Sequence, residues 1–279
     1  MKKEYKPFIK RVGGKRQLLS QIEKFYPKKF NRYFEPFVGG GAVFFDLRNK
    51  FGVDFEAHLF DINENMIITY NIIKDNVLGL IKELKSYPYN KDFFMEIRAW
   101  DRELSFKKKS NIKKAARFIY LNRTSFNGLH RVNSQGFYNV PMGKYTNPKI
   151  CDEETLMATK EALQNTTIIK EDFSNIIKYA KKGDFFYFDP PYDPLTDTAN
   201  FTGYNKGGFG REEQQKLFEV YKKLDKMGCF VMLSNHNTDF INNLYKDYHR
   251  HVVYARRSIN SDSSKRGVVE ETVILNYHI

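Results

Sequence analysis

Residues 32–63, RYFEPFVGGGAVFFDLRNKFGVDFEAHLFDIN, decide how this chain is organised. The stretch opens with the strand-like RYFEPF and closes with a second apolar strand, AHLFD. Between them, a run of glycines leads into AVFFDLRNK, which has the character of a helix. A strand, a helix and a further strand in this order predict a βαβ unit and a mostly parallel sheet.

The same α/β pattern returns further along the chain. From about residue 161 it continues through TTIIKEDF, GDFFYFDPPY, the helix EEQQKLFEVYKKLDKMG and the strand CFVMLSN, and it ends in a predicted strand pair, YARRSI and VVEETVILNY. In the helix, Leu217, Val220, Leu224 and Met227 share one face, and Gly228 is placed to end it. The fold class that we predict is therefore α/β.

A helical, polar stretch interrupts this pattern. We expect an α/β domain made of residues 1–66 and 151–279, with residues 67–150 inserted into it. The insertion is predicted to be mainly helical and to carry a β-hairpin within RTSFNGLHRVNSQGFYNVPMGKYTNP at 123–148, which is rich in turn-forming residues.

Charge and composition narrow the class of partner. The chain has 46 Lys and Arg against 33 Asp and Glu, a net charge of +13. This excess favours a polyanion such as nucleic acid, although a basic surface without a specific partner remains an alternative. No long apolar segment or secretory signal is visible, so we expect no membrane association. Cys151 and Cys229 form neither a disulfide framework nor a zinc motif, which fits a reducing cytoplasm and predicts no metal.

The glycine turn indicates a nucleoside ligand. Backbone N–H groups at the start of a helix attract polar or anionic groups. Counting from Gly39 and Gly41, however, Phe44 stands where the dinucleotide fingerprint has its third glycine, so a pyrophosphate is not favoured. Asp61, about twenty residues further on, can accept both hydroxyls of a ribose. The alternative for Asp61 is an ordinary helix N-cap.

The stretch FYFDPPY at 186–192 places a carboxylate at the end of an apolar strand. Asp189 is restricted to extended geometry by the proline that follows it, and Pro190 and Pro191 contribute carbonyls but no N–H groups. Tyr192 adds a flat ring. This set suits the exocyclic amine of a base, with its hydrogens directed to acceptors and its ring stacked on the tyrosine. A structural proline turn with a capping aspartate is the alternative.

Eight motifs in a fixed order cover nearly the whole chain. They are FIKRVGGKRQLL, YFEPFVGGGAVFFDL, FDIN, RTSFNGLHRVN, YNVPMGKY, YFDPPYDPLTDTANFTGY, LSNHNT and RRSIN. With them the chain resembles the Dam family of DNA adenine-N6 methyltransferases, which use S-adenosylmethionine. The resemblance implies a Rossmann-like methyltransferase sheet, in which residues 1–66 and 151–279 bind the cofactor and residues 67–150 recognise the target.

The resemblance also implies three sets of site residues. The catalytic set, which holds the extruded adenine, is Asp189, Pro190, Pro191 and Tyr192. The cofactor set is Arg11, Gly13, Gly14, Lys15, Glu35, Pro36, Phe37, Gly39, Gly40, Gly41, Asp61, Ile62, Asp172, Phe173 and Asp189. The DNA set is Lys10, Asn127, Leu129, Arg131, Asn133, Pro141 and Lys144. The implied target is GATC in double-stranded DNA, reached by base flipping.

Two alternatives to this function stay open. Arg11 stands where the family usually has tryptophan, and the only tryptophan is Trp100. A DNA-binding homologue with impaired catalysis is therefore one alternative. Cytosine-N4 methylation is the other, because that amine presents the same geometry. The resemblance further implies a cytoplasmic protein of a prokaryote or phage, with a cognate restriction endonuclease as partner only if the neighbouring genes encode one.

Arg131 shows how a single residue admits two interpretations. An arginine in a polar loop can bind the O6 and N7 atoms of guanine with two hydrogen bonds. A surface arginine in a salt bridge is the ordinary alternative.

Overall fold

The computed structural model describes residues 4–10, 15–195, 209–256 and 267–279. The chain divides into two compact units. The first unit takes its residues from 1–14, 39–54 and 63–168, and the second from 15–38, 55–62 and 169–279. The domain boundaries at 66 and 150 stay a prediction. No helix within the described residues is long and apolar enough to cross a membrane.

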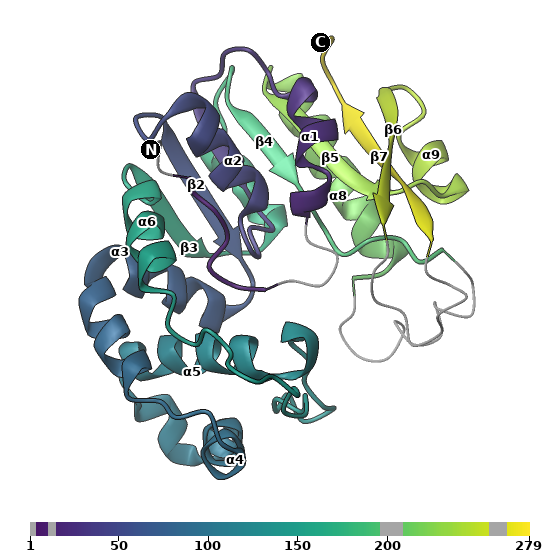
Figure 1. Ribbon diagram of the computed structural model, residues 1–279. Helices are drawn as coiled ribbons and strands as arrows, with labels where there is room; N and C mark the ends of the chain where they lie inside the picture. The colour runs from purple at the N-terminus through teal and green to yellow at the C-terminus, as the bar shows by residue number, and fades with distance from the viewer. Residues whose placement is uncertain (1–3, 11–14, 196–208, 257–266) are drawn as a thin grey trace. The chain divides into compact units, whose positions relative to one another are not determined.

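The described residues contain a seven-stranded sheet with the order β3-β2-β1-β4-β5-β7-β6 (Figure 1). Its strands are β1 Arg32–Glu35, β2 Glu56–Asp61, β3 Thr166–Lys170, β4 Phe185–Phe188, β5 Phe230–His236, β6 His249–Arg256 and β7 Val268–Leu275. Strand β1 pairs in parallel with β2 and β4, and β4 pairs in parallel with β5. This sheet confirms the predicted α/β fold.

The predicted final strand pair is present, with one correction. Strand β7 runs antiparallel to both β5 and β6. Strand β6 begins at His249, earlier than the stretch YARRSI, and residues 257–259 of that stretch lie outside the described residues.

The strand order places a topological switch point between β1 and β4. From β1 the sheet continues on one side to β2 and on the other side to β4. Because these strands are parallel, their carboxyl ends meet at one edge, where open α/β sheets bind ligands. Glu35 and Asp61 end β1 and β2, and Asp189 directly follows β4.

Aromatic side chains fill the core around the central strands. Phe34 of β1 stacks on Phe186 of β4, with ring centroids 4.4 Å apart, and on His58 of β2 at 4.5 Å. Burying rings of this size removes a large apolar area from water and stabilises the sheet. The sheet can therefore hold the residues at its carboxyl edge in fixed positions.

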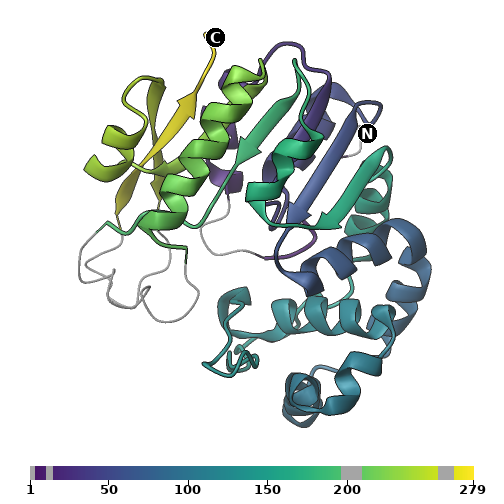
Figure 2. The same cartoon turned by 180° about the vertical axis from the view of Figure 1, so that it is seen from behind.

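Helices cover both faces of the sheet in the second unit. Helix α1, Leu19–Ile22, lies in front of the sheet in Figure 1, and α8, Arg211–Lys226, lies across the opposite face in Figure 2. Leu217, Val220 and Leu224 of α8 are buried as predicted. Met227 sits at the helix end and is exposed, and Gly228, with φ 75°, ends the helix as predicted. The short helix α9 spans Asp239–Leu244.

The first unit is mainly helical, and it contains the whole of the predicted insertion together with residues on either side of it. Its helices are α2 Ala42–Phe51, α3 Glu64–Lys85, α4 Lys91–Ala99, α5 Asn111–Thr124 and α6 Glu153–Ala162. Helix α3 packs against α5 and α6, and α4 packs against α5. The predicted hairpin is present as a turn-rich segment with two isolated antiparallel bridges, Ser125 with Met142 and Val132 with Tyr138.

Candidate functional site

A turn at the end of β4 brings the predicted catalytic residues together. The Tyr192 hydroxyl lies 3.0 Å from Asp189 Oδ1 and 2.9 Å from Glu271 Oε2. Lys15 Nζ lies over the Tyr192 ring, 4.4 Å from its centroid, and forms ion pairs with Glu271 at 2.6 Å and Asp189 at 3.4 Å. The side chain of Asp189 is 27% exposed, whereas Lys15 is buried. The turn can therefore present a carboxylate and a ring to a ligand, with a buried cation behind them.

The backbone of this turn is held by buried amides. Gln214 of α8 donates to the Pro191 carbonyl at 2.8 Å. Asn235 of β5 donates to Gln214 at 3.1 Å and accepts from the backbone N–H of Asp193 at 2.9 Å. The Pro191 carbonyl therefore already has a donor within the protein. The Pro190 carbonyl is the one that we expect to accept a hydrogen of the amine.

Asp193 is a second buried carboxylate, behind the turn. It accepts from Thr238 Oγ1 at 2.7 Å and pairs with Arg211 Nε at 3.2 Å. Its carbonyl contacts His236 Nδ1 at 2.7 Å. No role was predicted for these residues from the sequence, although the polar run LSNHNT after an apolar strand was a usable signal. Such buried hydrogen bonds fix a turn that prolines alone only stiffen.

Two carboxylates end the neighbouring strands. Glu35 of β1 is buried and accepts a hydrogen bond from the Tyr33 hydroxyl at 2.8 Å. Burial raises the pKa of Tyr33 well above its usual value, so this phenol remains a donor. Asp61 ends β2 partly exposed, and the next residue, Ile62, is 70% exposed. An exposed carboxylate beside an exposed apolar side chain suits the ribose and base of a nucleoside.

Three aromatic rings gather around residues predicted to bind the cofactor. Phe37, Phe173 and Phe209, here called the aromatic trio, have centroids 5.4–5.6 Å apart. Asp172 caps the 3₁₀ helix Phe173–Tyr179 by accepting from the backbone N–H and hydroxyl of Ser174. Phe209 was not predicted from the sequence, because it carries no motif signal of its own.

The glycine loop belongs to the first unit, and its conformation explains its residues. Gly39 and Gly41 have φ of 47° and 68°, and Gly41 precedes α2 in the left-handed region. A Cβ on Gly41 would lie 2.8 Å from the hydroxyl of Tyr70, which donates to the Gly39 carbonyl at 3.2 Å. Gly40 is buried. Arg11, Gly13 and Gly14 of the predicted cofactor set lie outside the described residues, and Pro36 is buried after β1.

Within the first unit, one asparagine joins the Lys10 segment to the turn at 126–128. Asn122 accepts from the Lys10 N–H at 2.7 Å and donates to the carbonyls of Lys10 and Gly128 at 2.8 and 3.1 Å. Lys10 Nζ lies over the ring of Tyr145, and Asn127 adopts a left-handed conformation with φ 53°. The predicted DNA residues Lys10 and Asn127 are therefore held on neighbouring segments.

Arg131 is exposed on the hairpin. Its Nε donates to Asn139 at 2.8 Å, and within the described residues no carboxylate pairs with it. The described residues therefore offer no carboxylate for the salt bridge that was the alternative role of Arg131. Asn133 closes the hairpin turn by accepting from the N–H groups of Gln135 and Phe137, so its side chain has a structural role as well as its predicted contact with DNA.

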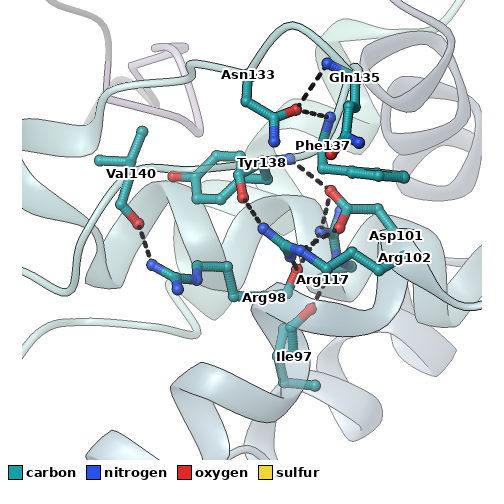
Figure 3. Close-up of polar contacts among 10 residues, drawn as sticks. All are labelled: Ile97, Arg98, Asp101, Arg102, Arg117, Asn133, Gln135, Phe137, Tyr138 and Val140. Atoms are coloured by element: carbon teal, nitrogen blue, oxygen red, sulfur yellow. Dashed lines mark hydrogen bonds and ion pairs between the residues drawn. The ribbon is translucent and has the colours of Figure 1, made fainter.

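A buried ion pair holds the hairpin on the helices (Figure 3). Asp101 accepts from Arg117 at 2.9 Å and from the backbone N–H of Tyr138 at 2.7 Å. Arg102 and Arg98 donate to the carbonyls of Tyr138 and Val140. Burial lowers the pKa of Arg117, and the nearby Asp101 opposes that shift. The hairpin segment after Arg131 is therefore anchored to the helices through the N–H and carbonyl of Tyr138 and the carbonyl of Val140.

The remaining predicted DNA residues lie on the same segment. Pro141 and Lys144 are exposed, and Leu129 is partly buried, with its carbonyl accepting from Tyr138. Phe126 is 50% exposed beside Asn127. Phe126 was not among the predicted DNA residues, although an aromatic residue directly before Asn-Gly in a turn could have suggested an exposed ring there.

A model of the family described as D12 class N6 adenine-specific DNA methyltransferase matches residues 12–259. The chain belongs to this family. It is 43% identical over 276 residues to Type II methyltransferase M1.LlaDCHI of Lactococcus lactis subsp. cremoris, covering 98% of this chain and 95% of the relative. It is 35% identical over 274 residues to the DNA adenine methylase of Escherichia coli (strain K12), covering 98% and 96%.

Membership of the D12 class confirms the predicted resemblance and the predicted enzyme class. The chain is an adenine-specific DNA methyltransferase, so the comparison favours adenine over cytosine. In the part of the chain that the structure describes, no three His, Cys, Asp or Glu side chains lie together in a way that could hold a metal ion.

Proposed function

We propose that this D12 methyltransferase transfers a methyl group from S-adenosylmethionine to the N6 amine of an adenine flipped out of duplex DNA, within GATC. The observation that carries the proposal is the turn at Asp189 and Tyr192, which offers a partly exposed carboxylate beside a ring. The assignments of individual residues to cofactor, base and DNA are part of this proposal.

The chemistry required of the turn is orientation of the amine. The lone pair of an exocyclic amine is delocalised into its heterocycle, so the nitrogen is a poor nucleophile. Asp189 and the Pro190 carbonyl accept one hydrogen each, which favours a pyramidal nitrogen whose lone pair points toward the methyl group. The neutral amine is too weak an acid for Asp189 to deprotonate it first. The proton therefore leaves after the methyl group has been transferred, when the nitrogen is cationic, and passes to the Asp189 carboxylate and then to water.

Tyr192 supplies the stacking surface for a flipped base. An enzyme that modifies a base takes it out of the helical stack and binds it in a pocket. Lys15 Nζ lies over the Tyr192 ring, and His236 makes a T-shaped contact with that ring, with centroids 4.8 Å apart. The base then stacks on the ring surface that these two side chains leave uncovered, where the amine can reach Asp189.

The residues of the second unit fit an adenosine-containing cofactor. Asp61 can accept the ribose hydroxyls, the exposed Ile62 offers an apolar contact, and the aromatic trio offers ring surface beside Asp172. S-adenosylmethionine would supply an electrophilic methyl group on a sulfonium. The task of these side chains is to bind and orient it. Gly39, Gly40, Gly41, Lys15 and Glu35 are assigned to the same cofactor by the family resemblance.

The hairpin and the Lys10 segment are proposed to bind DNA. Arg131 lies on an anchored hairpin and is exposed, and a residue that contacts a base edge must be exposed in the free protein. The net charge of +13 favours the phosphate backbone in general. Since relatives include proteins named Type II methyltransferase, a cognate restriction endonuclease is a proposed genetic partner. Expression in the cytoplasm of a prokaryote or phage-infected cell is part of the same proposal.

One experiment tests the whole proposal. The protein is incubated with tritiated S-adenosylmethionine and either a GATC duplex or duplexes with one base pair changed, and the methylated nucleosides are then separated. We expect N6-methyl-2′-deoxyadenosine from the GATC duplex alone. N4-methyl-2′-deoxycytidine would refute the proposed base, equal labelling of all duplexes would refute GATC, and no labelling would support the impaired homologue that the Arg11 departure suggests.

A further inference from the structure

Glu271 is a buried carboxylate at the catalytic turn to which the sequence motifs assign no role. It lies on β7, directly opposite His236 of β5 in the antiparallel register. Directly opposite residues in an antiparallel pair share one face of the sheet. Tyr192 contacts both of them: its hydroxyl lies 2.9 Å from Glu271, and its ring makes a T-shaped contact with His236. Glu271 is 7% exposed, so this contact is shielded from water.

Asp189 and Glu271 compete for the same two donors. Lys15 Nζ lies 2.6 Å from Glu271 Oε2 but 3.4 Å from Asp189 Oδ1. The Tyr192 hydroxyl is at nearly equal distances from the two carboxylates, 2.9 and 3.0 Å. A hydroxyl has one hydrogen and can donate to only one acceptor at a time. Glu271 therefore limits how strongly Lys15 and Tyr192 engage Asp189.

We infer that Glu271 is a positioning residue for methyl transfer, which draws the Lys15 ammonium and the Tyr192 hydroxyl away from Asp189. The Asp189 carboxylate then remains a strong acceptor for the hydrogens of the amine. This inference rests on the proposed role of Asp189 and adds a residue from a strand 79 positions beyond Tyr192 in the sequence.

The formal charges of Lys15, Asp189 and Glu271 support the same inference. Lys15 counts +1 and Asp189 and Glu271 count −1 each, so these three side chains sum to −1. The amine nitrogen gains positive charge as the methyl group bonds to it, and a fixed negative charge nearby stabilises that change. Without Glu271, the sum is zero, and Lys15 is free to pair with Asp189 alone. Lys15 is 4% exposed, so water screens this redistribution weakly.

The first test compares Glu271→Gln with Glu270→Gln. The rate of a single turnover is measured on a GATC duplex with DNA and S-adenosylmethionine saturating. We expect Glu271→Gln to slow methyl transfer by on the order of tenfold or more, the usual effect of losing a charged hydrogen bond. Glu270 is exposed and bonds Asn237, so its variant should keep the wild-type rate. An unchanged rate for Glu271→Gln would overturn the inference.

The second test uses a double variant whose outcome a purely structural role does not predict. Adding Tyr192→Phe to Glu271→Gln removes one redirected donor while keeping the ring. The double variant should be faster than Glu271→Gln alone. A structural role predicts that thermal stability changes while the single-turnover rate does not recover. If the double variant is not faster, the inference fails.

Two controls separate the possible failures. Glu271→Asp keeps the buried charge opposite Lys15 and so keeps the fold, but its shorter side chain cannot hold both donors; a wild-type rate for it would also overturn the inference. Asp189→Ala tests the site itself. If Asp189→Ala retains wild-type turnover, the proposed catalytic site is wrong. If Asp189→Ala loses turnover while Glu271→Gln keeps the wild-type rate, only the role of Glu271 is refuted.

Discussion

Gln214 donates a hydrogen bond to the carbonyl of Pro191 at 2.8 Å, so a helix on the face of the sheet fixes the turn that follows β4. Gln214 is buried, and its own carbonyl accepts from Asn235. The two rings restrict φ, and Pro191 also restricts Pro190 before it, but ψ of Pro191 stays free. The side chain of Gln214 supplies the restraint that the two prolines do not.

Replacing Gln214 with leucine should therefore lower both stability and turnover. The change leaves the Pro191 carbonyl and Asn235 Nδ2 without the partner that Gln214 supplies, at a cost of roughly 1–3 kcal/mol for each unsatisfied buried group. We expect kcat to fall more than cofactor affinity, because the turn loses its geometry. Urea denaturation and steady-state kinetics measure the two effects. Gln215→Leu is the matched control, since Gln215 is exposed on the same helix; an equal loss there would contradict the argument.

Gly41→Ala should destabilise the first unit through both strain and a clash. Gly41 has φ 68°, and a Cβ would lie 2.8 Å from the Tyr70 hydroxyl. Alanine at positive φ costs more than about 1 kcal/mol. Gly52→Ala isolates the strain, because Gly52 has φ 84° and a Cβ added there would have no neighbour within 4 Å. Gly41→Ala should therefore be the less stable variant in thermal melts, and Gly41→Ala with Tyr70→Phe should recover part of the difference.

The backbone-determined parts of the site could be predicted from the sequence. The glycines before α2 and the prolines after β4 restrict the local chain, so their conformations follow from residue type. Glu271 could not be found in this way, because in VVEETVIL it is one of two glutamates of a strand and only tertiary packing makes one of them buried. Gln214 could not be predicted for the same reason, because it is one of several polar residues in the run REEQQ and only tertiary packing buries it. Met227 shares its helix face with Leu217 and Leu224 but is exposed, because periodicity does not show where the partner surface ends.

Asp101→Asn should loosen the hairpin that carries Arg131. The amide oxygen of the new side chain can still accept from the Tyr138 N–H, but it carries no charge to balance the buried Arg117. Breaking one partner of a buried ion pair costs about 3–5 kcal/mol. We expect lower stability and weaker discrimination between GATC and altered duplexes, measured by denaturation and by competition binding. Glu103→Gln is the control, because Glu103 is exposed and contacts Ser105 and Lys109 instead. Unchanged discrimination in Asp101→Asn would show that the hairpin does not depend on the ion pair.

Arg131 and Lys144 should fail in different ways, because one is proposed to read a base and the other to contact phosphate. Arg131→Ala should cost roughly 1–3 kcal/mol of binding to the cognate duplex and much less on duplexes with one base pair changed. Its discrimination should therefore fall. Lys144→Ala should weaken binding about equally on all duplexes and reduce the slope of log K against log salt by about 0.9.

Salt titrations of both variants on GATC and altered duplexes, with cofactor present, measure these differences. Both side chains are exposed in the first unit, so neither change should disturb the fold, and thermal melts check this. Within the described residues the Arg131 side chain has one hydrogen bond, from Nε to Asn139 Oδ1, which Asn139→Ala removes without touching the guanidinium. That control should keep most of the discrimination. If Arg131→Ala retains the full difference between duplexes, the arginine does not read the base, and the hairpin loses its role in target recognition.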